Sequence, residues 1–334
     1  MADISCFGEI LVDLFAAAPS SPGAPRVFVE HAGGAPANVS VAAARLGARA
    51  RFVGMLGSDM FADGLLQALK RHGVDTGGVH RTDQAPTALA FVALDAAGER
   101  SFSFRRPPAA DLLFRARHFQ VEDFPAGGWF HVCSNSLTDT DIADATCEGM
   151  QRARDAGALV SMDLNLRPML WPQGVASHDA AWRALVLADL VKLSAEELDW
   201  LASTPGCQGP ADALDRLLSA RARCVVVTDG AAPLHWHTRS ARGSVAGFDV
   251  KMQDSTGAGD AFVGGLLVAL REAGVDAARW ADFCMDLPAL HGALRFAAAA
   301  GALAVTRQGA FAAMPSRHDV ESLLRQAPGV DHDA

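Results

Sequence analysis

A glycine-punctuated turn, DSTGAGDAF at residues 254–262, combines the residue types in this chain that are best suited to chemistry. Gly257 and Gly259 allow backbone angles that other residues disfavour, so the amides of the turn can converge on one point. That point lies at the N-terminus of a helix predicted over residues 261–270, where the helix dipole favours an anion such as a polyphosphate. Asp260 would repel phosphate, and it suits the role of general base for a hydroxyl that attacks phosphorus. A plain glycine-rich helix cap is the alternative that this motif leaves open.

A second glycine turn, GGAPAN at residues 33–38, precedes a clean helical pattern over residues 39–46. Its amides and the side-chain amide of Asn38 offer hydrogen-bonding groups that suit a polyhydroxylated ligand. The alternative is that Asn38 simply caps the helix.

Polar side chains lie at or just past the ends of predicted strands. The strand predicted over residues 4–14 contains Glu9 and Asp13, and carboxylates there are costly unless they bind a ligand or cap a helix. A second strand, predicted over residues 159–164, is followed directly by Asn165. Ligands of open α/β sheets bind at the carboxyl ends of strands, so these side chains are candidates for one site.

Residues 88–94 and 100–105 alternate around residues 95–98, a pattern typical of a β-hairpin. Their two-sided patterning predicts a small sheet that stands off the main body as a lid. Arg106 follows the hairpin, either as part of a solvated edge or as a lid arginine that reaches a substrate. Because exposed sheet edges tend to be paired, we expect the lid to mediate a homodimer. The apolar side chains available for this contact are Val27, Phe28, Phe91, Phe102 and Phe104.

Strand and helix patterns alternate along the rest of the chain, without an internal repeat or an interdomain linker. The alternation predicts an α/β fold with a doubly wound, mostly parallel sheet flanked by helices, together with a small β-sheet lid. Residues 1–325 are predicted to form a single domain, with lid segments at about 16–31 and 87–110. Residues 326–334 are predicted to form a C-terminal tail.

Composition limits the kinds of partner. With 334 residues, 50% of them hydrophobic, the chain is long and apolar enough to bury a large core. The formal net charge of −9 argues against nucleic acid as a partner, because phosphate backbones need a basic face. The N-terminal apolar segment, residues 4–15, is too short to span a bilayer, so no membrane partner is expected. Six scattered cysteines without a CxxC pair indicate reduced thiols and a cytoplasmic location.

The two glycine turns, 33–38 and 254–262, resemble the paired signatures of the ribokinase-like (PfkB) carbohydrate kinases. The resemblance extends from residue 4 to about residue 315, and it implies a ribokinase-like fold and ATP-dependent phosphorylation of a sugar. Four further strings resemble the fructokinase branch, which implies conversion of D-fructose to D-fructose 6-phosphate. These strings are RPPAAD at 106–111, DLNLR at 163–167, LWP at 170–172 and KLSAEE at 192–197.

The resemblance implies a role for each matching residue. Asp260 would deprotonate the sugar hydroxyl, and the turn formed by Gly257, Ala258 and Gly259 would hold the transferring phosphoryl group. The residues that would bind the sugar are Asp13, Gly33, Gly34, Asn38, Arg106 and Asn165. Those that would contact ATP are Lys192, Thr228, Gly230, Gly257, Gly259 and Gly301. Glu197 would order the water shell of Mg²⁺, and a monovalent cation site, with K⁺ as the candidate ion, would comprise Asp254, Thr256, Ala304 and Gly309.

Rival functions remain open from the sequence. Within the family, the alternatives are a 2-keto-3-deoxygluconate kinase and another sugar or nucleoside kinase. A dinucleotide-dependent oxidoreductase would need a glycine fingerprint after the first strand, where the chain instead has residues 9–13, EILVD. A non-catalytic sugar-binding protein could share the scaffold, although the presence of Asp260 argues against it.

Overall fold

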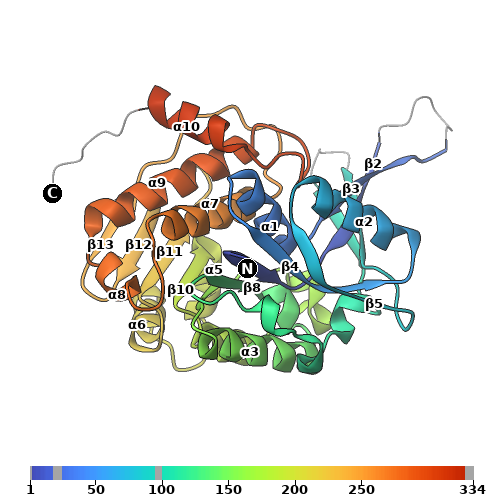
Figure 1. Ribbon diagram of the computed structural model, residues 1–334, viewed down its shortest axis with the longest axis horizontal. Coiled ribbons are helices and arrows are strands. Elements are labelled where there is room, and N and C mark those ends of the chain that lie inside the picture. The colour runs from blue at the N-terminus through green and yellow to red at the C-terminus, as the bar shows by residue number, and fades with distance from the viewer. Residues whose placement is uncertain (1, 18–24, 95–99, 328–334) are drawn as a thin grey trace.

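The computed structural model describes residues 2–17, 25–94 and 100–327, which form two sheets of different size (Figure 1). Within these residues the large sheet has the strand order β13-β12-β11-β10-β9-β8-β1-β4-β5. All neighbouring strands from β11 to β5 run parallel, and β12 and β13 add an antiparallel edge. The strands are β1 (Ile4–Phe7), β4 (Ala50–Gly57), β5 (Asp75–Thr82), β8 (Trp129–Cys133), β9 (Leu159–Asp163), β10 (Leu190–Ser194), β11 (Cys224–Thr228), β12 (Leu234–Thr238) and β13 (Arg242–Val245).

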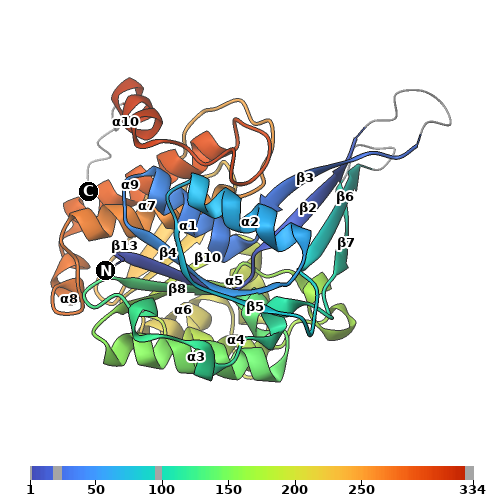
Figure 2. The ribbon, with the colours of Figure 1, turned by 45° about the vertical axis from the view of Figure 1, so that its right-hand side comes forward.

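Helices cover both faces of this sheet, which explains why its central strands are apolar on both sides. In β1, Ile4 and Cys6 pack into the core beneath α7 and α9, and Phe7 packs into the opposite core beneath α3. Figures 1 and 2 show the two layers on either side of the sheet. The first layer contains α1 (Ala35–Arg45), α2 (Met60–Arg71), α7 (Ala258–Glu272), α8 (Trp280–Phe283), α9 (Leu287–Ala304) and α10 (Arg317–Gln326). The second contains α3 (Thr140–Asp155), α4 (His178–Leu185), α5 (Ala195–Ala202) and α6 (Pro210–Ser219).

Short 3-10 helices occupy the connections between these elements. They are η1 (Ala110–Leu113), η2 (Ala116–His118), η3 (Val121–Asp123), η4 (Ser134–Leu137), η5 (Pro168–Leu170) and η6 (Pro172–Gly174). Within the described residues, α9 is the helix whose length and composition would allow it to cross a membrane. It packs in the interior against α7, where a Cβ at Gly265 would lie 3.0 Å from the Cβ of Ala300, so it forms part of the core.

The small sheet is the predicted lid, and it projects from one end of the molecule (Figure 2). Its strand order is β3-β2-β6-β7, with β2 (Leu11–Ala16), β3 (Phe28–Gly33), β6 (Leu89–Leu94) and β7 (Arg100–Arg105). The predicted hairpin is confirmed, since β6 and β7 pair antiparallel from Leu89 opposite Arg105 to Leu94 opposite Arg100. Residues 95–98 of its turn lie outside the described residues, as do residues 328–334 of the predicted tail.

The prediction of one strand over residues 4–14 is wrong, because this segment forms two strands that belong to different sheets. β1 lies in the middle of the large sheet, and β2 lies in the lid. The chain turns between them at Gly8, whose φ of 147° favours glycine. A Cβ at Gly8 would also lie 2.7 Å from the Pro36 side chain, so α1 closes tightly over this turn.

Candidate active site

The predicted phosphate-binding turn begins α7, as expected. Gly257 is the N-cap with a left-handed φ of 75°, and Ala258 and Gly259 form the first helical turn. The first amides of a helix have no partner within the helix, so this turn can present donors at the positive end of its dipole. The amide of Ala258 donates a 3.3 Å hydrogen bond to the carbonyl of Ser255. A Cβ at Gly257 would lie 2.9 Å from the Met314 side chain, so a larger residue would be both strained and crowded. The turn therefore has the local structure that the sequence predicts.

The carboxylate of Asp260 is buried one residue further along this helix. Asn38 Nδ2, on α1, donates a hydrogen bond to Asp260 Oδ2 at 2.7 Å. The two glycine turns, more than 200 residues apart, thus meet at one point. The other amide atom, Asn38 Oδ1, is buried without a hydrogen-bond partner among the described residues. An unpaired buried acceptor is costly, and the hydroxyl of a bound sugar would satisfy it.

Burial raises the pKa of Asp260 above its ordinary value, while the hydrogen bond from Asn38 and the charges of Arg167 and Lys192 act against this shift. Asn38→Ala removes an opposing contribution, so the pKa of Asp260 should rise further. A base must be ionised to act, and the acid limb of the kcat/KM–pH profile should therefore move to higher pH in the variant. An acid limb that stays in place would show that Asn38 does not tune Asp260.

A buried ion pair lies beside the turn. Asp163 ends β9 and Lys192 lies opposite it on β10, with Lys192 Nζ 3.1 Å from the Asp163 carboxylate. A Cβ at Gly259 would lie 3.2 Å from Lys192 Nζ, which places the ammonium against the helix N-terminus. Burial alone would lower the pKa of Lys192, but the carboxylates of Asp163 and Glu197 raise it, so the ammonium stays charged. This charge and the amides of α7 face the same region, as predicted for a phosphate site.

Two further predicted residues continue this edge of the sheet. Asn165 is buried in the left-handed region at φ 41°, and its amide donates to Asp163 Oδ1 at 3.2 Å. Glu197 caps α5 by accepting from the amide of Ser194 at 2.7 Å, and its other oxygen accepts from the amide of Leu166 at 2.6 Å. Each oxygen keeps a second lone pair, so the carboxylate can still accept from water. No cluster of three or more metal-ligating side chains occurs among the described residues.

The predicted sugar side is formed where the lid meets α1. Asp13 lies on β2 opposite His31 of β3, and a Cβ at Gly33 would collide with the Asp13 carboxylate. Gly34 has a φ of 105°, and a Cβ there would lie 2.6 Å from the carbonyl oxygen of Glu9. Burial raises the pKa of Asp13 to about 7, and the charge of Asp254 adds to the shift. The close approach of the backbone therefore requires glycine at position 34, whereas a side chain at position 33 would displace the Asp13 carboxylate.

Arg106 is not part of a solvated edge, one of the two alternatives that the sequence left open, because its side chain is only 1% exposed. Its Nε donates to Asp111 Oδ2 at 2.7 Å, its Nη1 to Thr138 Oγ1 at 3.2 Å and its Nη2 to the carbonyl of Asn135 at 2.6 Å. The structure therefore ties the guanidinium to the body, and a sugar contact would have to use its remaining N–H groups.

Glu9 is buried, and its hydrogen-bond partners were not predicted from the sequence. Its carboxylate accepts from the amide of Ala35 at 3.1 Å and from Asn135 Nδ2 at 2.9 Å. Burial raises the pKa of Glu9, and Arg106 is the largest influence that opposes this shift. The only signal for Glu9 in the sequence was a carboxylate in an apolar strand. In the structure, Glu9 anchors the start of α1 through the hydrogen bond from the amide of Ala35.

Three residues that were predicted to contact ATP lie in separate segments of the chain. Thr228 ends β11, and its hydroxyl donates to the carbonyl of Leu193 at 3.4 Å. Gly230 is exposed with a φ of 54°, and no atom lies within 4 Å of a Cβ built there. Gly301, on α9, packs against α7, with a built Cβ 3.2 Å from the carbonyl of Ala258. Close packing of α9 against α7 thus favours a small residue at Gly301, apart from the predicted contact to ATP.

The predicted monovalent-cation residues are gathered around one carboxylate. Asp254 Oδ1 accepts from the amide of Thr256 at 2.8 Å, and Asp254 Oδ2 accepts from the amide of Gly309 at 3.1 Å. Ala304 is the buried last residue of α9, and the carbonyl of Val305 next to it accepts from the amide of Asp254 at 3.2 Å. The structure therefore brings these segments together, and ion binding by them stays a prediction.

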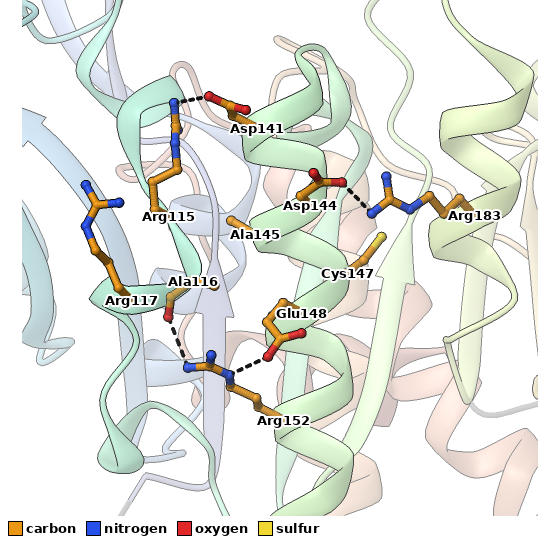
Figure 3. Close-up of a pocket in the computed structure, with 10 residues that line it drawn as sticks. All are labelled: Arg115, Ala116, Arg117, Asp141, Asp144, Ala145, Cys147, Glu148, Arg152 and Arg183. Atoms are coloured by element: carbon orange, nitrogen blue, oxygen red, sulfur yellow. Dashed lines mark hydrogen bonds and ion pairs between the residues drawn. The ribbon is translucent and has the colours of Figure 1, made fainter.

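A hollow on the surface of the described residues lies elsewhere. It has a volume of about 700 Å³ and is bordered by α3, η2 and α4, and Figure 3 shows its lining. None of the predicted site residues lines it. Three of its arginines are neutralised by carboxylates, through the pairs Arg115–Asp141, Arg152–Glu148 and Arg183–Asp144. We therefore place the candidate site at the α7 turn and not in this hollow.

This chain is similar to known proteins over nearly its whole length. The model of the pfkB family of carbohydrate kinases matches residues 1–317. Fructokinase-1 of Oryza sativa subsp. japonica is 39% identical over 323 residues, which cover 96% of this chain and 97% of that protein.

Two solved structures superpose over nearly the whole chain. A fructokinase from Xylella fastidiosa with bound ATP is 55% identical, with a TM-score of 0.93 over 98% of this chain and 100% of that one. A fructokinase from Vibrio cholerae O395, in a form with fructose, ADP and a calcium ion, is 34% identical, with a TM-score of 0.83 over 97% and 99% of the two chains.

Proposed function

The chain belongs to the pfkB family of carbohydrate kinases, and from this premise we propose that it is an ATP-dependent fructokinase. It transfers the terminal phosphoryl group of ATP to the primary hydroxyl at carbon 6 of D-fructose and produces D-fructose 6-phosphate. The observation that carries this proposal is the 2.7 Å hydrogen bond between Asn38 and Asp260, which unites a sugar-binding amide and a base at the N-terminus of α7. The fructokinase relatives, one of them with bound fructose, support the choice of sugar.

The proposed mechanism relies on position and charge. Phosphoryl transfer needs an attacking hydroxyl in line with the leaving oxygen and positive potential around the transferring group. Asp260 accepts the hydroxyl proton late, as the new phosphorus–oxygen bond forms, because an alcohol is too weak an acid to lose it earlier. The amides of Gly257, Ala258 and Gly259 and the ammonium of Lys192 stabilise the developing negative charge. Asp13, Gly33, Gly34, Asn38 and Asn165 position the sugar, with Arg106 in support.

Mg²⁺ is the divalent ion that we propose for the reaction. Because Mg²⁺ usually keeps several of its waters, a carboxylate with free lone pairs such as Glu197 fits a water-mediated contact. When bound with ATP, the ion neutralises charge on the phosphates. Thr228, Gly230 and Gly301 are the proposed contacts to the nucleotide. Asp254, Thr256, Ala304 and Gly309 are proposed to hold K⁺.

A panel of sugars tests the function. Purified protein is supplied with ATP and Mg²⁺, and ADP formation is followed with D-fructose, D-ribose, 2-keto-3-deoxygluconate and D-fructose 6-phosphate as acceptors. We expect kcat/KM to be highest for D-fructose, because a site built to bond several hydroxyls rejects sugars that lack them. Higher kcat/KM for ribose or 2-keto-3-deoxygluconate would replace the fructokinase assignment by another within the family.

We further propose that the lid mediates a homodimer. Val27 and Val29, at the edge strand β3, are 59% and 48% exposed. Behind them Phe28 meets Phe91 edge to face at 5.4 Å, so the lid already buries part of its aromatic surface. Light scattering at micromolar concentration should give twice the chain mass for the native protein and a reduced mass for Val29→Lys. A monomeric native protein would exclude the dimer.

The proposed location is the cytoplasm, where ATP is abundant and thiols stay reduced. All six cysteines are free in the structure, in agreement with such a compartment.

A further inference from the structure

A cluster of arginines gathers at the edge of the large sheet opposite the candidate active site. A hollow of about 400 Å³ opens there, lined by Arg154, Arg221, Arg223 and Arg239 together with Asp189 and Trp280. Leu159, which begins β9, also lines it, whereas Asp163, which ends β9, belongs to the active site. Five residues of strand span about 15 Å, so the two regions are separated by the length of the strand. Trp280, which lines the hollow, belongs to α8, and Figure 2 shows α8 at the end of the molecule away from the lid.

The arginines outnumber the acids that face them. Asp189 lies 2.9 Å from Arg221 Nε, and its other oxygen accepts from the amide of Val160 at 2.9 Å. Asp155 also lies near Arg154, but its carboxylate accepts from Gln151 Nε2 at 2.8 Å. The local excess of positive charge stands out in a chain whose formal net charge is −9.

Two of these guanidinium groups also lack the partners that a purely structural role would give them. Arg154 Nη1 donates to Gln151 Oε1 at 3.2 Å, but its Nε is buried and has no hydrogen-bond partner among the described residues. The Arg223 guanidinium, half-buried, has no hydrogen bond or ion pair within the described part of the chain. Burial lowers the pKa of Arg154, and the charge of Arg221 lowers it further, so the guanidinium groups repel each other in the folded protein. An anion in the hollow would relieve this repulsion and supply the missing acceptors.

We propose that this hollow binds the phosphate group of a small phosphorylated ligand. A guanidinium presents parallel N–H donors that match the oxygens of phosphate, and several arginines around one point favour a doubly charged phosphate over a carboxylate. The volume admits a sugar phosphate or inorganic phosphate, and both share this group. Because the hollow is distinct from the α7 turn, it binds phosphate whether or not the sugar kinase assignment holds.

Equilibrium dialysis with radiolabelled inorganic phosphate and, separately, D-fructose 6-phosphate tests the proposal. The double variant Arg154→Gln/Arg223→Gln should lose one equivalent of binding per chain, with affinity at the hollow reduced at least tenfold, because each charged donor contributes about that much. Arg117→Gln/Arg183→Gln removes the same charge from the other hollow (Figure 3) and should keep the full stoichiometry. If D-fructose 6-phosphate binds ten times more tightly than inorganic phosphate, the ligand is a phosphorylated metabolite. Equal affinities would identify the free ion.

Three results would overturn the proposal: no binding equivalent that depends on these arginines, equal losses in both double variants, or a loss of folding stability with binding unchanged. The last result would mean that the arginines only stabilise the fold, through the interaction of their charge with the C-terminal carbonyl groups of α3 and α6. If the double variant does not fold, the exposed Arg239→Gln replaces it. Its side chain bonds only the carbonyl of Ala220 among the described residues, so it should weaken binding several-fold without unfolding the protein, and unchanged affinity would count against the site.

Discussion

Asp260→Asn is expected to lower kcat by roughly 10²–10⁴-fold, the usual contribution of a general base. The variant keeps the size of the side chain but removes the group that accepts the hydroxyl proton. The affinity for ATP should change little, since the substitution keeps the backbone amides of Gly257 and Gly259 and the other proposed nucleotide contacts. Steady-state kinetics with D-fructose, together with nucleotide titration by calorimetry, measures both quantities.

The same variant should not lose folding stability at neutral pH. The pKa of Asp260 is raised in the folded protein by burial, so folding favours the protonated carboxyl. The stability that this group contributes is present at low pH and is lost as the pH rises through the folded pKa. A neutral amide avoids that loss, and urea unfolding at pH 7 should give an unchanged or higher midpoint. Asp139→Asn, at the N-cap of α3, is a matched control that should leave kcat unchanged, because Asn caps helices as well as Asp. Near-native turnover in Asp260→Asn would exclude Asp260 as the base.

Arg106→Met should destabilise the protein by about 3–5 kcal/mol, the typical cost of removing one partner from a buried ion pair. Its guanidinium pairs with Asp111 and lies close enough to Glu9 to act on its pKa. Methionine fills similar space but leaves both carboxylates without a cation. The urea midpoint at pH 7 measures the loss.

Arg105→Met provides the matched control for this prediction. Arg105 is exposed and adjacent in sequence, so removal of its charge should change stability by less than about 0.5 kcal/mol. If both variants unfold at the same urea concentration as the native protein, Arg106 does not stabilise the fold. A KM for D-fructose that rises more than the KM for ATP in folded Arg106→Met would show an additional role at the sugar.

The features that the sequence predicted correctly are those that local patterns determine. The glycine turn before α7 and the hairpin of β6 and β7 depend on neighbouring residues, and both occur as expected. The strands β5, β12 and β13 were not predicted, because polar residues interrupt the apolar pattern in each of them.

The partners of individual side chains were the least predictable features. The bonds of Arg106 reach residues 5, 29 and 32 positions away in sequence, and its burial depends on how the lid joins η1 and η4. Nothing in its neighbourhood distinguishes it from the exposed Arg105. The contact between Asn38 and Asp260, by contrast, could be expected only because both turns matched one family.

The division between β1 and β2 at Gly8 has a consequence for how this protein can diversify. Asp260, Asn38 and Lys192 belong to helices and strands of the body, whereas Asp13 stands on a lid with its own sheet and its own small apolar cluster around Leu11 and Ala90. Mutations in the lid can therefore alter the proposed sugar contact of Asp13 while the proposed phosphoryl-transfer groups stay in place. Selection on the lid can change the part of sugar preference that depends on Asp13, whereas the part that depends on Asn38 stays linked to Asp260 through their hydrogen bond.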